Sequence, residues 1–427
     1  MNTAEFERGS GKQLRIHVLP TKRFKTFAIS LYAGIPLRED TVTHVALTPF
    51  VLRRGTESYP ETTQFREQLE HLYGAGFGFD VYKRGDYQIV QFRMDTINDS
   101  FVGGGEQRLL DRSFAFLGEV LTKPARENGN FKTSYVQAER ETVRKKLESI
   151  VNDKMRYAAE RCIEEMCKHE PYRLHPLGDR KALPAIESPE LTSAYESWLL
   201  EASMDLYVVG DTTLEEVEQL VQRHFNLERA VSPDYLAQAA VRGDEETNTV
   251  IERLNIGQGK LNMGLRTSIT YADDKYAGAL MYNGILGGYP HSKLFVNVRE
   301  KESLAYYASS RYDGHKGIAT IQSGIEIPNY EKAVTIIKQQ LEEMKHGNIT
   351  DLEMSQTKAM IRNLLKEMQD SAFEMIAYDF NRQLSGKERT PEELLGQIEQ
   401  ISKQDVREAA EQFRLDTIYF LRDEKGE

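Results

Sequence analysis

The sequence predicts an α+β protein of two similar halves, each a mostly antiparallel sheet covered by helices on one face. Strand and helix patterns follow one another in the same order in both halves. A polar stretch with Pro233 and Gly243 separates them, as a connection does. The 427 residues are enough for two to three domains of roughly 150 residues. We place an N-terminal domain at 1–228, a linker at 229–247 and a C-terminal domain at 248–427.

In the first half, alternating apolar residues at 14–36 predict a strand, a turn and a second strand with one buried face. A further pair of strands is expected within 76–95, and a single strand at 205–211. Segments with helical periodicity lie between and after these strands. The expected helices are 41–54, 61–73, 106–122, 132–168, 188–200 and 213–225. Gly103–Gly105 precedes one of them and is interpreted as a hinge, since the Lys-Ser/Thr of a phosphate-binding loop does not follow.

The second half repeats this order. Strands are expected at 249–254, at 260–269, twice within 303–325, and at 417–421, the last following a helix as in the first half. The helices are expected at 273–286, 292–301, 329–346, 350–385 and 403–413. This repetition indicates an internal duplication.

Composition excludes several classes of protein. A net charge of -11 disfavours general nucleic-acid binding, which uses a basic face. No apolar run reaches the 18 or so residues of a membrane helix, and the mean hydropathy is -0.54. The N-terminus has no basic segment followed by an apolar core, so we expect no signal peptide and a cytoplasmic location. Cys162 and Cys167 point in different directions on a helix, so two buried free cysteines are expected rather than a disulfide or a metal site, even with His169 nearby.

The most informative stretch is LFVNVREKESLAYY, residues 294–307, which follows a loop expected at 286–290 containing Gly287 and Gly288. It resembles the R-E-K-x-x-L-A-Y signature of the pitrilysin/insulinase family of zinc peptidases. In that family the arginine and tyrosine hold the substrate backbone near the metal. The resemblance assigns this substrate-binding role to Arg299 and Tyr306 and places the two glycines beside the cleft. Without the resemblance, the ordinary interpretation would be that Arg299 pairs with a neighbouring glutamate and that Tyr306 belongs to the core.

The metal motif of the family is H-x-x-E-H on a helix that ends in Gly-Thr. Here Gly55-Thr56 aligns with that ending, and the motif positions fall on residues 46–50. Ala46 and Phe50 replace the two histidines, which at i and i+4 would bind one zinc, and Pro49 replaces the general base. The third ligand position carries Lys146, whose ammonium has no lone pair for a metal, while Glu139 seven residues earlier is kept. The resemblance therefore implies a peptidase-like chain with no catalytic residues and no zinc of its own.

Two other places could offer ligands. His44 lies just before the lost motif, and Glu67 with His71 copies its i, i+4 spacing. A surface helix carries such charged pairs routinely, since Phe65 and Leu69 supply its apolar side. We expect neither place to bind metal.

The resemblance covers nearly the whole chain and implies a clamshell in which an extended peptide adds to a sheet edge. It also implies a partner, because paired family members divide the work: one subunit carries H-x-x-E-H and zinc, the other the arginine and tyrosine. Such bacterial cytosolic pairs are associated with elongation factor P modification. The leading hypothesis is a non-catalytic, peptide-binding subunit of such a heterodimer. A stand-alone peptide-binding or scaffold protein, and an active peptidase with unconventional ligands, remain open.

Overall fold

The computed structural model describes residues 5–102, 108–227, 232–236 and 246–424. The chain forms two compact units that exchange segments. Unit 1 comprises residues 1–147, 174–236 and 371–384, and unit 2 comprises residues 148–173, 237–370 and 385–427. The domain boundaries expected from the sequence do not include this exchange. The hinge expected at Gly103–Gly105 and most of the expected linker lie outside the described residues.

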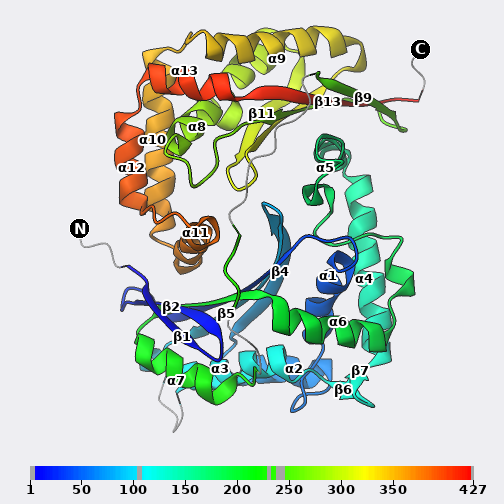
Figure 1. The fold of residues 1–427 in the computed structure, drawn as a ribbon, viewed down its shortest axis with the longest axis vertical. Coiled ribbons are helices and arrows are strands. Elements are labelled where there is room, and N and C mark those ends of the chain that lie inside the picture. The colour runs from blue at the N-terminus through cyan, green and yellow to red at the C-terminus, as the bar shows by residue number, and fades with distance from the viewer. Residues whose placement is uncertain (1–4, 103–107, 228–231, 237–245, 425–427) are drawn as a thin grey trace. The chain divides into compact units, whose positions relative to one another are not determined.

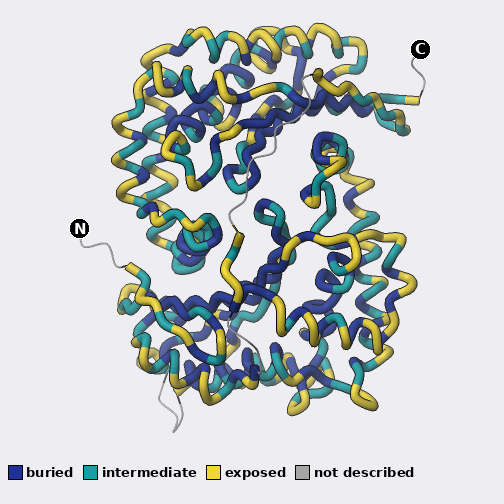
Figure 2. Tube along the Cα trace, in the orientation of Figure 1, coloured by how far each residue is buried: buried dark blue, intermediate teal, exposed yellow. Residues whose placement is uncertain are grey.

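The main sheet of unit 1 has six strands in the order β1-β2-β8-β3-β5-β4, and only β2 and β8 run parallel. Strands β3 and β8 are buried along almost their whole length (Figure 2). Strand β4 forms one outer edge and pairs only with β5 among the described strands. The strands of unit 1, including a separate two-stranded sheet, are β1 Glu7–Gly11, β2 Leu14–Pro20, β3 Thr26–Pro36, β4 Gly76–Arg84, β5 Tyr87–Ile97, β6 Arg126–Glu127, β7 Asn130–Phe131 and β8 Ser203–Gly210.

Helices cover one face of this sheet, with α2, α3 and α7 side by side below it in Figure 1. A core of inward-facing residues such as Ile29, Leu31, Phe114 and Trp198 joins the sheet to these helices. The elements are α1 Val42–Leu52, α2 Thr62–His71, η1 Asp99–Phe101, α3 Leu109–Thr122, α4 Thr133–Asn152, η3 Leu183–Ala185, α6 Ser188–Glu201 and α7 Leu214–His224.

The opposite face of the unit 1 sheet is covered by α11, Ala372–Ser385, from the second half of the chain. Alternate residues of a strand point to opposite faces, so Tyr32 of β3 faces away from the main core. Its ring stacks on Phe380 of α11 with centroids 3.8 Å apart. An ion pair 2.6 Å long between the exposed Arg8 and the buried Asp379 links the same helix to β1.

The sheet of unit 2 has five strands in the order β11-β12-β10-β13-β9, and only β9 and β13 run parallel. Helix α13 contacts both α8 and α9 beside it. The elements are β9 Asn248–Arg253, β10 Gly259–Arg266, α8 Tyr276–Asn283, η4 Gly284–Gly288, η5 Phe295–Lys301, β11 Ala305–Asp313, β12 Ile318–Ile325, η6 Ile327–Asn329, α9 Tyr330–Lys345, α10 Asp351–Met368, α12 Pro391–Gln400, α13 Lys403–Gln412 and β13 Arg414–Arg422.

Helix α5, Lys154–Met166, and the turn η2, Pro171–Arg173, belong to unit 2 although they come from the first half of the chain. Cys162 of α5 packs on Tyr419 and Leu421 of β13. Just beyond α5, Glu170 accepts an ion pair from Arg266 at 2.6 Å and from Lys316 at 2.8 Å. Each sheet therefore carries one helix from the other half of the chain on its second face.

The fold class is confirmed: two mostly antiparallel sheets pack against helices. The helix expected at 132–168 is two helices, because Asp153 caps α5 by accepting from the backbone N–H of Arg156. The helix expected at 350–385 is also two. Strand β1 and helix α12 were not predicted. No helix in the described ranges is long and apolar enough to span a membrane.

Candidate functional site

Helix α1 places the lost metal motif in unit 1. Its residues are buried almost throughout, with Ala46 fully enclosed and Phe50 only 4% exposed. Pro49 lies inside the helix, where it has no N–H to donate to the carbonyl of Val45. The segment is helical because its mostly apolar residues are buried almost without interruption, and this packing outweighs the cost of the proline.

Phe50 and Lys146 line one cavity of about 310 Å³. The resemblance assigned these two residues to ligand positions far apart in the sequence, so their meeting supports the alignment. The ammonium Nζ of Lys146 lies 5.9 Å from the centre of the Phe50 ring, a cation–π contact. The cavity lining also comprises Arg53, Phe77, Gly78, Phe79, Asp80, Val81 and Leu177.

The residues at this position do not fit zinc. A methyl group, a phenyl ring and an ammonium occupy the three ligand places, and none of them donates a lone pair to a metal. The described part of the chain contains no group of three or more His, Cys, Asp or Glu side chains that could hold a metal ion. Metal-activated water therefore has no support here.

Arg53 is the cavity residue that the sequence reasoning missed. Its guanidinium lies over the rings of Phe50, at 5.8 Å, and Phe79, at 5.5 Å. The available signal was its place three residues after Phe50, which puts both side chains on one helical face. Together with Lys146 it gives the cavity two cations and apolar walls, and the one lining carboxylate, Asp80, pairs with Arg93. This combination suits a carbonyl or carboxylate oxygen beside an apolar side chain.

Glu139, the acidic residue kept beside the third ligand position, is 1% exposed. Its Oε1 accepts a hydrogen bond from Nε of Arg54 at 2.6 Å, and Arg53 lies 3.9 Å from Oε2. This carboxylate therefore ties α4 to the end of α1. It acts as a partner for arginine rather than as a metal ligand.

Five of the cavity residues, 77–81, belong to β4, the outer strand of the sheet. Most residues of β4 are half-buried. An outer strand offers backbone N–H and C=O groups to an added strand, so an extended peptide on β4 would place side chains at the cavity.

Arg299 and Tyr306 lie in unit 2, where both are exposed. Arg299 belongs to η5, and its guanidinium lies 4.6 Å from the centre of the Phe295 ring. No ion pair of Arg299 occurs among the described residues, and Glu302 pairs instead with Lys332 at 2.8 Å. The pairing of Arg299 with a neighbouring glutamate is thus not observed.

Tyr306 is 63% exposed and does not belong to the core. It falls where the register between β11 and β12 shifts, since Ala305 pairs with Ile325 and Tyr307 with Gly324. A bulge of this kind re-aims a side chain, and β11 is the outer strand of its sheet. The backbone N–H of Leu304 donates to the carbonyl of Val298 at 3.1 Å, which joins the start of β11 to the helix that carries Arg299.

The loop expected at Gly287 and Gly288 is wrong: both residues lie in η4, a π-helical turn that continues α8. The apolar helix simply continues through the glycines. A Cβ at Gly287 would lie 2.5 Å from the backbone nitrogen of Ser310 in β11, so only glycine permits this close approach. A substrate-binding role for the two glycines stays a prediction.

The two alternative metal places are accounted for by ordinary contacts or exposure. Nε2 of His44 lies 2.9 Å from a carboxylate oxygen of Glu190, joining α1 to α6. Glu67 and His71 lie on the solvent side of α2, opposite the buried Phe65.

Cys162 and Cys167 are free and buried, as expected. Burial raises the pKa of the Cys162 thiol far above its usual range, which makes it a poor nucleophile or ligand.

Taken together, the fold and the altered site define a two-unit metallopeptidase-like protein whose metal position is filled by other side chains. Comparison with known proteins agrees. The family model described as Peptidase M16 inactive domain matches residues 185–361. A relative named "Probable inactive metalloprotease YmfF", from Bacillus subtilis strain 168, is 38% identical over 97% of this chain and 96% of its own length.

The chain belongs to the peptidase M16 family, as an inactive homologue of its metallopeptidases, and the pitrilysin/insulinase resemblance is confirmed. A crystal structure of a conserved protein from Enterococcus faecalis V583 is similar throughout, with a TM-score of 0.93, 30% identity and coverage of 99% of this chain and 100% of that one. A protease from Helicobacter pylori shares the fold, with a TM-score of 0.81 and 16% identity over 98% and 99% of the two chains.

Proposed function

We propose that this chain is a non-catalytic, peptide-binding subunit that supplies Arg299 and Tyr306 to the cleft of a zinc-bearing paralogue. The observation that carries the proposal is the contrast between the altered metal position and the substrate signature. Lys146 and Phe50 fill the metal place, while the guanidinium and phenol of the substrate signature remain exposed on an outer strand and its adjoining helix.

In the shared cleft, Arg299 and Tyr306 would donate hydrogen bonds to a substrate carbonyl, or to the oxyanion that forms on it. Zinc in the partner would supply the activated water. Removal of one such donor costs roughly 10²–10³ in rate. The proposal also includes a cytoplasmic location, which rests on the N-terminal sequence, and a link to elongation factor P modification, which rests on the family resemblance alone.

The test uses an active paralogue from the same cell, assayed alone and mixed with this chain. We expect Arg299→Ala or Tyr306→Phe to lower peptide cleavage by the mixture by roughly 10²–10³ while complex formation stays intact. Arg253→Ala, on the outer strand β9 at the other edge of the unit 2 sheet, and Tyr73→Phe, at another exposed tyrosine, are matched controls. Equal cleavage in every mixture would reject the shared site. Chelator-sensitive cleavage by this chain alone would revive the active-peptidase reading.

The cavity beside β4 favours a second candidate, a stand-alone peptide-binding protein. Its two cations would hold a carboxylate of a peptide added to that strand. A fluorescent peptide should then bind the isolated chain. Binding should weaken when the chain carries Lys146→Met or when the C-terminus of the peptide is amidated. Lys145→Met is the matched control, since this neighbour is 69% exposed and does not line the cavity. Equal binding by the natural chain, by both variants and of the amidated peptide would show that the cavity does not hold the peptide carboxylate.

A further inference from the structure

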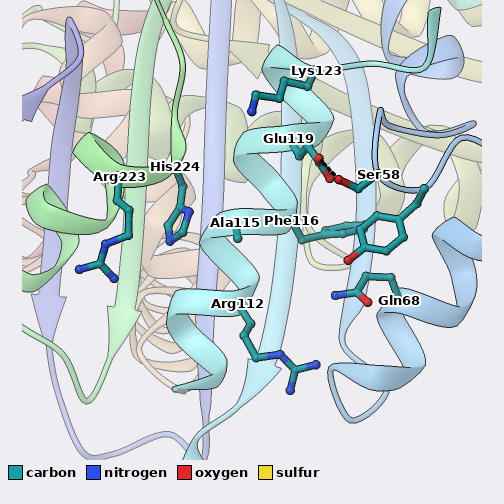
Figure 3. Close-up of a pocket in the computed structure, with 10 residues that line it drawn as sticks. Ser58, Gln68, Arg112, Ala115, Phe116, Glu119, Lys123, Arg223 and His224 are labelled. Carbon is teal, nitrogen blue, oxygen red and sulfur yellow. Dashed lines mark hydrogen bonds between the residues drawn. The ribbon is translucent and has the colours of Figure 1, made fainter. Parts of the chain in front are cut away.

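The cations of this chain differ in how far nearby carboxylates balance them. A cavity of about 490 Å³ beside α3 in unit 1 is lined by Arg112 and Arg223, whose head groups lie on opposite sides of that helix (Figure 3). Nη1 of Arg223 donates to Oδ1 of Asp111 at 2.6 Å, and Glu119 also lines the cavity. The charges at this cavity are therefore partly balanced and do not converge on one ligand.

Lys260, on β10 of unit 2, is a half-buried cation without such balance. Its ammonium donates to Oε1 of Gln258, and no ion pair with a carboxylate occurs within the part of the chain that the structure describes. Burial lowers the pKa of Lys260, and the charge of Asp153 offsets this only in part. An ammonium has three N–H donors, so two of them remain for a ligand. A cation that has lost water without gaining a carboxylate favours an anionic ligand.

The ring of Tyr307 connects this ammonium to the substrate signature. Lys260 pairs with Gly324 of β12, and Gly324 pairs with Tyr307 of β11, so the three residues form a row across the sheet. A Cβ at Gly324 would collide with the Tyr307 ring, so the glycine allows the ring to lie across β12. Nζ of Lys260 lies 5.9 Å from the centre of that ring, a cation–π contact.

This row lies on the sheet face that carries α5. A Cβ at Gly264, four residues after Lys260 on the same strand, would lie 2.5 Å from Sδ of Met166 in α5. Alternate residues of a strand share a face, so Lys260 lies on this side too. Burial, together with the charge of Asp153 at the start of α5, raises the pKa of Tyr307 to about 12. The row therefore offers an ammonium and a protonated phenol on one face of the sheet.

Lys260 lies close to the substrate signature because Tyr306 and Tyr307 are consecutive. Adjacent Cα atoms are about 3.8 Å apart, so the reach from a carbonyl at Tyr306 to Nζ of Lys260 is on the order of 10 Å. An extended peptide covers this distance in about three residues. We propose that Lys260 is a specificity-determining residue that binds an aspartate or glutamate of the substrate near the bond held by Arg299 and Tyr306. This inference rests on the proposed peptide function and adds a substrate class to it, peptides with an acidic residue close to the cleaved bond.

The test compares peptides that differ only in one Glu or Gln, cleaved by the mixture of this chain and the active paralogue. The Glu is moved in turn through the positions on either side of the cleaved bond. At one position we expect kcat/KM to be roughly tenfold higher for the Glu peptide, since a hydrogen bond between charged groups contributes about this factor. Lys260→Met should abolish the preference by raising KM for the Glu peptide. Lys338→Met is the matched control and should keep it, because Lys338 is an exposed lysine on α9 of the same unit.

Circular dichroism checks that the variants fold, and Lys260→Arg, which keeps the positive charge, should keep most of the preference. The inference would be overturned if the natural mixture preferred Glu at no position, or if the preference persisted with Lys260→Met, since the partner would then bind the acidic residue. Equal loss in Lys260→Arg and Lys260→Met would also overturn it, because packing rather than charge would be responsible.

The failure of this inference is distinguishable from the failure of the proposed function. Cleavage by the mixture that does not depend on Arg299 or Tyr306 would reject the shared site and this inference with it. Cleavage that depends on both residues but shows no preference for Glu would reject the role of Lys260 alone.

Discussion

Restoring the metal motif tests the interpretation of the degenerate site directly. The variant carries Ala46→His, Pro49→Glu, Phe50→His and Lys146→Glu, and should bind one zinc ion per chain, whereas we expect the natural chain to bind none. Positions 46 and 50 lie one turn apart on α1, and Phe50 and Lys146 already line one cavity. Two imidazoles and a carboxylate can therefore meet at the roughly 2 Å ligand distances of zinc.

The expected change in stability has two parts: the packing cost of the new side chains and the stabilisation by bound zinc. Without zinc, the variant should be less stable than the natural chain. A histidine at the fully enclosed position 46 overpacks the core by about 1–3 kcal/mol, and replacing the buried Phe50 loses apolar contacts. Removing Pro49 returns a backbone donor to the helix and offsets part of this loss. Zinc at 1,000 times its Kd then adds about 4 kcal/mol. A unit of this size gains about 2–4 °C in Tm for each kcal/mol, so zinc should raise Tm by about 10 °C.

The assay is thermal unfolding with and without zinc, together with elemental analysis of the dialysed protein. The control keeps Lys146 and carries only the three changes on α1. It should bind zinc far more weakly, because it has two of the three ligands and an ammonium beside them. A folded four-site variant that binds no zinc would refute the alignment of the motif. Equal binding by the three-site control would show that position 146 is not the third ligand place.

Two further predictions concern buried charges. Burial alone would raise the pKa of Asp205, but hydrogen bonds from Arg15 and His17 hold it at about 2. This folded-state pKa is below the unfolded value, so the carboxylate contributes about 2 kcal/mol to the free energy of unfolding above pH 4, and this contribution is lost as the pH falls from about 4 to 2. In urea unfolding, the difference in stability between the natural chain and Asp205→Asn should therefore shrink between pH 4 and pH 2. A difference that stays constant over this range would contradict the prediction. Glu170→Ala removes a carboxylate that pairs with the buried Arg266 and Lys316, whereas Arg266 keeps its pair with Asp416. Chemical unfolding should therefore show a loss of stability near the lower end of about 3–5 kcal/mol, and a loss under 1 kcal/mol would show that the cluster is not needed to dock α5.

The sequence by itself determined most of the elements and the places of the altered motif. The alternating apolar residues of β3 and the mostly apolar sequence of α1 indicate burial, so these two elements could be predicted from local sequence alone. The position of Lys146 relative to Gly55-Thr56 came from the family resemblance, and the shared cavity with Phe50 supports it. Exposure of Tyr306 was a hypothesis that the structure decided.

Only the tertiary structure decided which surfaces meet. The spacing of apolar residues in α5 and α11 predicts that one side of each helix is buried. It does not predict which of the two sheets that side packs against. The exchange of these helices between units therefore could not be predicted. The same holds for the cavity beside α3: Arg112 and Arg223 both line it only because α3 and α7 pack side by side. Local patterns fix which residues are hidden, whereas the partners of those residues depend on contacts between distant segments.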